Sequence, residues 1–157
     1  NSGYFDSNAS VSADGKVMYF VSERPKGKGN GDIWMSKANS TTSWQTAVNL
    51  LDVNTIEDEK GVFIAADGKT IFFSSKGHKN MGGYDIFKSV RQDDGSWSEP
   101  MNLGHPINTP GDEVDFTLTA DGKTAYYSTK GSANGKFDIM KIDLSNYPLV
   151  NGVSVAE

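Results

Sequence analysis

The chain has 157 residues, enough for one ordinary domain, and its composition fits neither a disordered protein nor a coiled coil. Fifteen basic against twenty acidic side chains give a net charge of -5, and the charges are scattered singly, so no nucleic-acid-binding face is indicated. The absence of cysteine excludes disulfides and thiolate chemistry but fits oxidising and reducing compartments equally well. No apolar run approaches the ~20 residues of a membrane-spanning helix, so we expect no direct membrane insertion.

A four-residue sequence, Ala-Asp-Gly-Lys, occurs three times along the chain. Its aspartates lie 53 and 54 residues apart. A fixed period of this size, built from strand patterns, is typical of propellers and solenoids, in which each unit buries its face on the next. Asp-Gly is also a tight hairpin signal, because Gly tolerates a positive φ and the Asp side chain caps the turn. We interpret the following residues as structural turns of the repeat: Asp14, Gly15, Asp67, Gly68, Asp121 and Gly122.

Two predicted strands flank each turn. Alternate apolar residues precede it, as in Val62, Ile64 and Ala66 of the second unit, and this period of two predicts a strand. After the turn, each unit has an aromatic pair within a second predicted strand. We expect the inner rings of these pairs to fill the space between neighbouring sheets. The second strands are predicted at 17–22, 70–75 and 124–129.

A Gly- and Lys-rich loop then leads to a third predicted strand, which opens on an aspartate in every unit: Asp32, Asp85 and Asp138. A fourth strand is predicted to begin at Trp44 and again at Trp97, running to residues 50 and 103. The equivalent position of the third unit is Asn151, and Tyr147-Pro148 interrupts the path to it, so we expect this unit to lack its own outer strand. Four antiparallel strands per unit are the pattern of a propeller blade.

These units predict an all-β chain, a β-propeller fragment of three four-stranded antiparallel blades that forms part of a larger ring of about six. We expect blades at 1–50 and 51–104, a last blade at 105–146 without its own outer strand, and a segment at 147–157 that is a tail or the start of a following β-domain. Three blades alone leave open sheet edges, which predicts self-association or instability in isolation.

The repeat also carries a family resemblance. Ser12-Ala13-Asp14-Gly15-Lys16, with Tyr19-Phe20 and Asp32-Ile33-Trp34, resembles the TolB-type, WD-like propeller repeat. The linkers, Asn54-Thr55 with Asp58-Glu59 and Asn108-Thr109 with Asp112-Glu113, are similar more narrowly to repeats in OmpA-family, peptidoglycan-associated envelope proteins of Bacteroidetes-like bacteria. The resemblance implies a periplasmic protein associated with the outer membrane, a scaffold that binds other envelope proteins within an assembly such as a secretion or gliding apparatus. It implies contact with peptidoglycan only through a domain that lies outside this sequence.

Two sets of repeated aspartates have competing interpretations. The turn aspartates Asp14, Asp67 and Asp121 have the surroundings of neither a calcium loop nor a full sialidase-like Asp box, so we favour a turn-forming role. Asp32, Asp85 and Asp138 recur at the start of a strand, where they are expected to accept backbone N–H groups of the preceding loop. Holding a cation is the alternative for this second set.

Acidic pairs also precede the first strands of two units, the strands that usually line the central channel of a propeller. Asp58, Glu59, Asp112 and Glu113 are therefore candidates for a binding face that gathers a cation or a basic partner at the channel mouth, and ordinary solvation is the alternative. Trp34 is a further candidate for this face. Trp44 and Trp97 are expected to pack between blades. His78 and His105 belong to no assignable catalytic arrangement, and we expect no catalytic residue, metal or cofactor.

Three functions compete on these grounds. A non-catalytic scaffold for protein–protein interaction in the cell envelope is favoured, because a rigid ring presents many loops to partners. A glycan-binding propeller would need exposed aromatic and amide groups that converge at one end. The propeller of a hydrolase ranks last, because a carboxylate that recurs in every unit is better explained by the repeat than by an asymmetric active site.

Overall fold

The computed structural model describes residues 2–131 and 135–150, and the chain is all-β over these ranges. Within them it contains no helix of the length and apolarity needed to cross a membrane. The strands are β1 (Asp6–Val11), β2 (Val17–Ser22), β3 (Asp32–Lys37), β4 (Val48–Asn49), β5 (Glu59–Ile64), β6 (Thr70–Ser75), β7 (Asp85–Val90), β8 (Met101–Asn102), β9 (Asp112–Leu118), β10 (Thr124–Lys130) and β11 (Phe137–Asp143).

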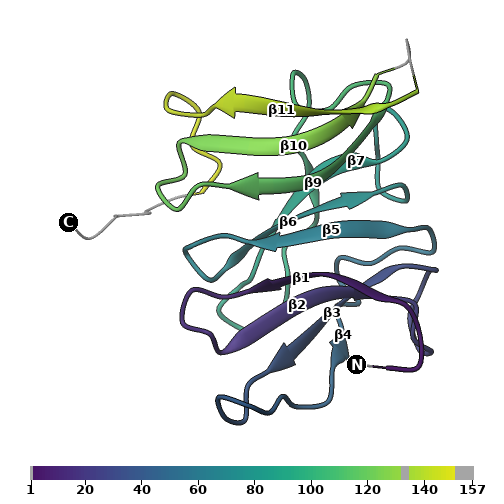
Figure 1. The fold of residues 1–157 in the computed structure, drawn as a ribbon, viewed down its shortest axis with the longest axis vertical. Coiled ribbons are helices and arrows are strands. Elements are labelled where there is room, and N and C mark those ends of the chain that lie inside the picture. Colours follow the sequence, from purple (N-terminus) through teal and green to yellow (C-terminus); the bar gives the residue numbers. More distant parts are fainter. Residues whose placement is uncertain (1, 132–134, 151–157) are drawn as a thin grey trace.

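These strands form three antiparallel sheets, each built from strands consecutive in the chain. The orders are β1-β2-β3-β4, β5-β6-β7-β8 and β11-β10-β9. Figure 1 shows the sheets stacked face to face, with β5 between β1 and β9, both of which it contacts. This is the arrangement of consecutive propeller blades, and it confirms the predicted fold class. We call the sheets blade 1, blade 2 and blade 3 in chain order.

The Asp-Gly turns close the first hairpin of every blade. Gly15, Gly68 and Gly122 have φ of 70°, 67° and 70°, the left-handed region that favours glycine. In each turn the aspartate Oδ1 accepts a hydrogen bond of 3.0 Å from the backbone N–H two residues later, for example Asp14 from Lys16. One turn geometry therefore recurs at all three positions of the repeated sequence.

The core consists of two apolar layers, one between each pair of neighbouring blades. The two rings of each aromatic pair lie on opposite faces of the second strand, because side chains alternate along a strand. The first ring of the pair faces toward the following blade in the chain, and the second ring faces toward the preceding one. Thus Tyr19 of blade 1 packs in the same layer as Phe73 of blade 2. Likewise, Phe72 of blade 2 packs in the same layer as Tyr127 of blade 3, and lies 4.8 Å from Phe116 between ring centroids. We call these two sides of a blade its forward face and its backward face.

The predicted fourth strands are shorter in the structure than the sequence pattern indicates. Trp44 and Trp97 each form a single bridge to the residue that follows the third strand, and the ladder resumes as the two-residue strands β4 and β8. Between these points a third-strand serine replaces the backbone: Ser36 Oγ donates to the carbonyl of Gln45, and Ser89 Oγ to that of Ser98. Blade 3 has three strands among the described residues, and the equivalent position Asn151 lies outside them.

The first strand of each blade (β1, β5 and β9), which we call its inner strand, contains one β-bulge. The register shifts between Ser7 and Ser10 in β1, and equivalent shifts occur in β5 and β9. Asn8, Gly61 and Asp115 occupy the bulges with φ of 50°, 55° and 58°. Asn8 Nδ2 donates to Asp115 Oδ1 at 3.3 Å, so the side chains at two of the bulges connect blade 1 to blade 3.

Candidate binding pocket at the ends of the inner strands

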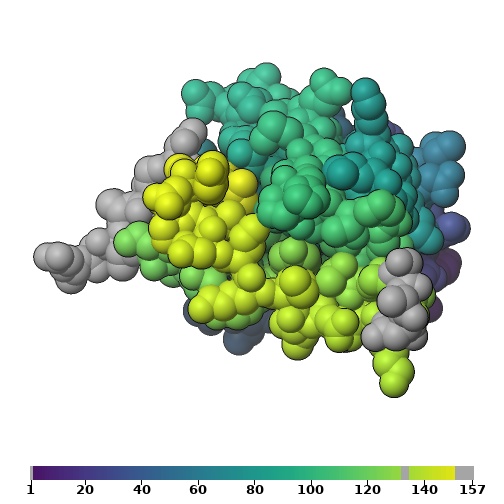
Figure 2. Space-filling view, turned by 90° about the horizontal axis from the view of Figure 1, so that it is seen from above, coloured from purple at the N-terminus to yellow at the C-terminus, as the bar shows by residue number. Residues whose placement is uncertain are grey.

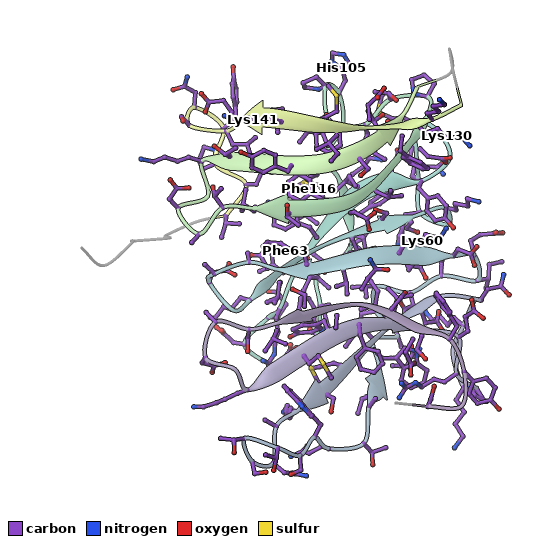
Figure 3. All side chains as sticks on the ribbon, in the orientation of Figure 1. Lys60, Phe63, His105, Phe116, Lys130 and Lys141 are labelled. Carbon is purple, nitrogen blue, oxygen red and sulfur yellow. The ribbon has the colours of Figure 1, made fainter. Side chains whose placement is uncertain are left out.

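A pocket of about 680 Å³ lies where the three inner strands begin, at the end opposite the Asp-Gly turns. Blades 1, 2 and 3 all contribute to its walls. Figure 3 shows Lys60 and Lys130, both of which line it, at the same end of the sheets. The exposed rings of Phe5 and Phe137 also line it. Five carboxylates and two lysines surround the space among the described residues, so its wall carries an excess of negative charge.

The predicted aspartates of this face, Asp58 and Asp112, lie on the pocket wall. Both contact Tyr84, whose hydroxyl donates to Asp58 Oδ2 at 3.2 Å and whose backbone N–H donates to Asp112 Oδ1 at 3.0 Å. Burial raises the pKa of the Tyr84 hydroxyl, and the neighbouring Asp58 charge raises it further. The ammonium groups of Lys60 and Lys76 lie 4.6 and 4.4 Å from the centre of the Tyr84 ring. Tyr84 therefore links the acidic and basic groups of the pocket.

The glutamates of the acidic pairs lie inside the protein, so neither the predicted binding face nor its alternative, ordinary solvation, describes them. Glu59 is fully buried and accepts three hydrogen bonds, from the backbone N–H of Thr55 (3.0 Å), from Thr55 Oγ1 (2.7 Å) and from Ser75 Oγ (2.8 Å). Glu113 is buried in the same way by its own hydroxyl partners, Thr109 and Thr129. Each glutamate ties the linker before a blade to the second strand of that blade.

Asp6 takes the corresponding place in blade 1, although the first unit lacks the acidic pair. Ser2 donates to it through its backbone N–H at 2.9 Å, and Arg24 forms an ion pair with it at 2.9 Å. A signal for this arrangement is present in the sequence: in all three units a hydroxyl residue lies four positions before the acid and sixteen positions after it. Those triplets are Ser2, Asp6 and Ser22; Thr55, Glu59 and Ser75; Thr109, Glu113 and Thr129.

The Asp6 carboxyl should make the free energy of unfolding depend on pH. Burial raises its pKa, but hydrogen bonds from Ser22, Ser2 and Arg24 outweigh burial and hold the pKa well below the usual range. A folded-state pKa below the unfolded value stabilises the fold above the unfolded pKa, and this contribution is lost as the pH falls through the folded pKa. We expect the free energy of unfolding to decrease below about pH 5 and Asp6→Asn to remove part of that decrease. Urea denaturation across this pH range measures both slopes, and equal slopes would contradict the assignment.

The strand-opening aspartates differ between blades. Asp32 accepts the backbone N–H groups of Lys28 (2.6 Å) and Gly29 (3.1 Å), and Asp85 accepts that of Met81. Asp138 is exposed in β11, and part of the loop that precedes it in sequence lies outside the described ranges. In blades 1 and 2 these aspartates therefore hold the preceding loop. Among the described residues no group of three metal-ligating side chains is placed to hold an ion.

Two asparagines that the sequence analysis did not single out are buried in the linkers. Asn54 accepts the backbone N–H of Ile33 and donates to its carbonyl, both at 2.8 Å, and Asn108 does the same for Ile86 at 2.8 and 2.9 Å. Each side-chain amide thereby extends the hydrogen-bond ladder of the third strand. Asn54 precedes Thr55 and Asn108 precedes Thr109, so their recurrence was visible in the linkers.

The remaining predicted residues lie away from the pocket. Trp34 is buried on the backward face of blade 1, where the Arg24 guanidinium covers it at 5.2 Å, so it does not share a surface with the aspartates. Trp97 packs between blades as predicted, edge-on to Tyr19 at 5.8 Å. Trp44 is exposed. His78 packs on Phe73 in the layer between blades 1 and 2.

Comparison with solved structures shows which proteins share the fold of this chain. The structure matches TolB from Acinetobacter baumannii with a TM-score of 0.62 and 21% identity, over 90% of this chain and 30% of that one. It matches a TolB-like protein from Agrobacterium tumefaciens with a TM-score of 0.64 and 15% identity, over 92% of this chain and 47% of that one. The fold is a TolB-like β-propeller fold.

A third solved structure also matches the chain. An α-L-arabinofuranosidase from Lactobacillus brevis aligns with a TM-score of 0.50 and 18% identity, over 84% of this chain and 47% of that one. The chain thus spans less than half the length of each of these structures. No protein-family model and no curated protein sequence matches the chain.

Proposed function

We propose that this TolB-like chain is a non-catalytic protein-interaction module of the bacterial cell envelope, periplasmic and associated with the outer membrane, and that a basic segment of a partner protein binds in the pocket at the ends of the inner strands. The composition of the pocket wall is the observation that carries the proposal. Aromatic rings at the edge of a pocket provide contact area, and an excess of carboxylates favours a positively charged partner. The TolB-like fold supports the location in the envelope.

The hydrogen bonding of the acidic groups supports a binding role for this wall. Asp58 and Asp112, which lie on the pocket wall, accept hydrogen bonds from Tyr84. These bonds hold the carboxylates in fixed positions, so their charges form a constant field at the pocket. Such a field steers a basic segment toward the site and aligns it before close contact.

Cross-linking to extracts of the source bacterium's envelope tests this proposal. An amine-reactive cross-linker should join partner proteins to Lys60 and Lys130 of the pocket, and not to Lys16 and Lys123 in the turns at the opposite end. Asp58→Asn combined with Asp112→Asn keeps an oxygen acceptor for each Tyr84 contact but removes both charges. We expect several-fold fewer links with this variant and with added salt.

A matched control is Asp93→Asn, which removes an exposed charge that forms a 3.6 Å surface ion pair with Lys69. It should leave the cross-links unchanged. Links confined to the turn lysines would overturn the proposed site. If no protein were linked and defined oligosaccharides were instead retained or cleaved, a glycan-binding propeller or a hydrolase would replace the proposal.

A further inference from the structure

One position of the repeat holds a different kind of residue in each blade, although its backbone conformation is the same. Asn8, Gly61 and Asp115 occupy the bulges of the inner strands with φ of 50°, 55° and 58°. Glycine adopts this region most readily, and a non-glycine residue held there is a mark of functional sites. None of the three belongs to β11, whose yellow-green residues Figure 2 shows at the surface of one end of the stack.

The chemistry of this position is therefore asymmetric: an amide in blade 1, no side chain in blade 2 and a carboxylate in blade 3. The turn position of the repeat behaves in the opposite way, because it holds Asp-Gly in every blade. The fold of the bulge requires only the backbone conformation, which glycine alone would satisfy. The amide and the carboxylate are thus additions that the bulge does not need, and a binding site can use them.

The side chains of the bulges converge on one another. A Cβ atom at Gly61 would lie 2.9 Å from the backbone nitrogen of Asp115 and 3.0 Å from its Oδ1, so the glycine leaves the space that Asp115 occupies. Asn8 Nδ2 donates to this Oδ1 at 3.3 Å, whereas Oδ2 accepts no hydrogen bond from the described residues. Both side chains are exposed. Asn8 therefore orients a carboxylate whose second oxygen can accept from a ligand.

Two cavities meet at this hydrogen bond. One is the acidic pocket of about 680 Å³, and the other is a smaller cavity of about 180 Å³, and Asn8 and Asp115 line both. The rest of the smaller wall is mainly apolar and includes Ala9, Phe63 and Phe116. Figure 3 shows Phe63 and Phe116 on the inner strands, farther from the pocket end than Lys60 and Lys130. The wall thus changes from acidic to apolar at the Asn8–Asp115 pair.

We propose that Asp115 is the specificity-determining residue of the pocket and binds the guanidinium of an arginine in an extended partner segment, whose residue two positions away places an apolar side chain in the smaller cavity. This inference rests on the proposed function. Side chains two positions apart lie on the same face of an extended chain, so one segment can reach both cavities. A guanidinium presents several coplanar donors, which can pair with the Asp115 carboxylate and the Asn8 carbonyl together.

Titration of the ¹⁵N-labelled chain with the peptide acetyl-Arg-Gly-Leu-amide tests this assignment. Nuclear magnetic resonance should show saturable shifts of the backbone amides of Asn8, Gly61 and Asp115. Citrulline in place of arginine keeps the shape but removes the charge, and should weaken binding about tenfold or more. Lysine should bind several-fold more weakly than arginine, because an ammonium lacks the planar fork of donors.

Variants of the chain separate the carboxylate from the residue that orients it. Asp115→Asn should weaken binding of the arginine peptide about tenfold or more, and asparagine tolerates the positive φ of this position. Asn8→Gly introduces the residue of blade 2 and should weaken binding several-fold, because it removes only the orienting amide. Asp93→Asn, the exposed control, should bind the peptide as wild type does. Circular dichroism melts check that each variant is folded.

The smaller cavity is tested by filling it. Ala9→Leu should weaken binding of acetyl-Arg-Gly-Leu-amide but leave that of acetyl-Arg-Gly-Ser-amide unchanged, because the serine peptide places no apolar side chain there. Equal losses for both peptides would contradict a contact with the apolar residue.

Two results would overturn the role of Asp115: an Asp115→Asn variant that binds the arginine peptide as wild type does, or a lysine peptide that binds as tightly as the arginine peptide. Absence of saturable shifts would also overturn it. These results leave the proposed function separately testable, because cross-links to Lys60 and Lys130 that are lost on Asp58→Asn with Asp112→Asn would still support a basic partner in the pocket.

Discussion

Phe72→Ala should lower the free energy of unfolding by about 3–5 kcal/mol, as is typical for truncating a fully buried phenylalanine. Phe72 is completely buried in the layer between blades 2 and 3, where its ring contacts Phe116. Truncation removes this contact and leaves a cavity between two sheets that can close only if the blades move together. Urea denaturation followed by far-ultraviolet circular dichroism measures the loss.

Tyr126→Ala is the matched control, since it truncates the equivalent ring on the open face of blade 3. At concentrations below those of any self-association it should cost less than about 1 kcal/mol, because the Tyr126 side chain already contacts solvent. The comparison holds position in the repeat constant and changes only whether a neighbouring blade is present. Equal losses for Phe72→Ala and Tyr126→Ala would show that the blade-to-blade layer is not what buries these rings.

Glu59→Ala should be the second strongly destabilising change, with an expected loss of about 2–4 kcal/mol. The substitution leaves the Thr55 N–H, the Thr55 hydroxyl and the Ser75 hydroxyl without their shared acceptor. Donors left unpaired in a buried position each cost about 1–3 kcal/mol, and rotation of the hydroxyls recovers part of that. The linker before blade 2 should also exchange its amide hydrogens faster, which mass spectrometry can locate at Thr55.

Two further variants serve as controls. One removes the charge of Glu59 but keeps a hydrogen-bond acceptor, and the other removes a nearby carboxylate that is exposed. Glu59→Gln retains one oxygen acceptor and should fall between wild type and Glu59→Ala. Glu57→Ala removes an exposed carboxylate from the same linker and should stay within about 0.5 kcal/mol of wild type. A Glu59→Ala variant as stable as Glu57→Ala would mean that the buried hydrogen bonds contribute nothing to the fold.

The features predicted correctly from the sequence depend on contacts that are local or repeated. The Asp-Gly turns and the second strands needed only hairpin chemistry and a period of two, and β2 and β6 have the predicted bounds. The fourth strands were overestimated, because the Ser36 and Ser89 hydroxyls replace ladder hydrogen bonds there. Pattern reasoning cannot distinguish a strand that pairs through its backbone from an extended segment that pairs through side chains.

The candidate site was predicted in part. The aspartates of the acidic pairs lie on the pocket wall, but their neighbouring glutamates are buried by hydroxyl groups that are sixteen residues away in sequence. Phe5, Tyr84 and Phe137 were not identified, although Tyr84 and Phe137 share a position in the repeat, directly before a strand-opening aspartate. A pocket made where repeats meet depends on the packing angle between blades, and that angle has no signature in the sequence.

The two linker networks together define where one blade can be exchanged for another. Asn54 forms hydrogen bonds with Ile33 of blade 1, which precedes it in the chain, whereas the adjacent Thr55 forms hydrogen bonds with Glu59 of blade 2, which follows it. The same division falls between Asn108 and Thr109. A cassette that runs from residue 55 to residue 108 therefore carries every hydrogen bond of these two networks that blade 2 needs. Recombination at these two peptide bonds would duplicate or replace a whole blade without leaving either network incomplete.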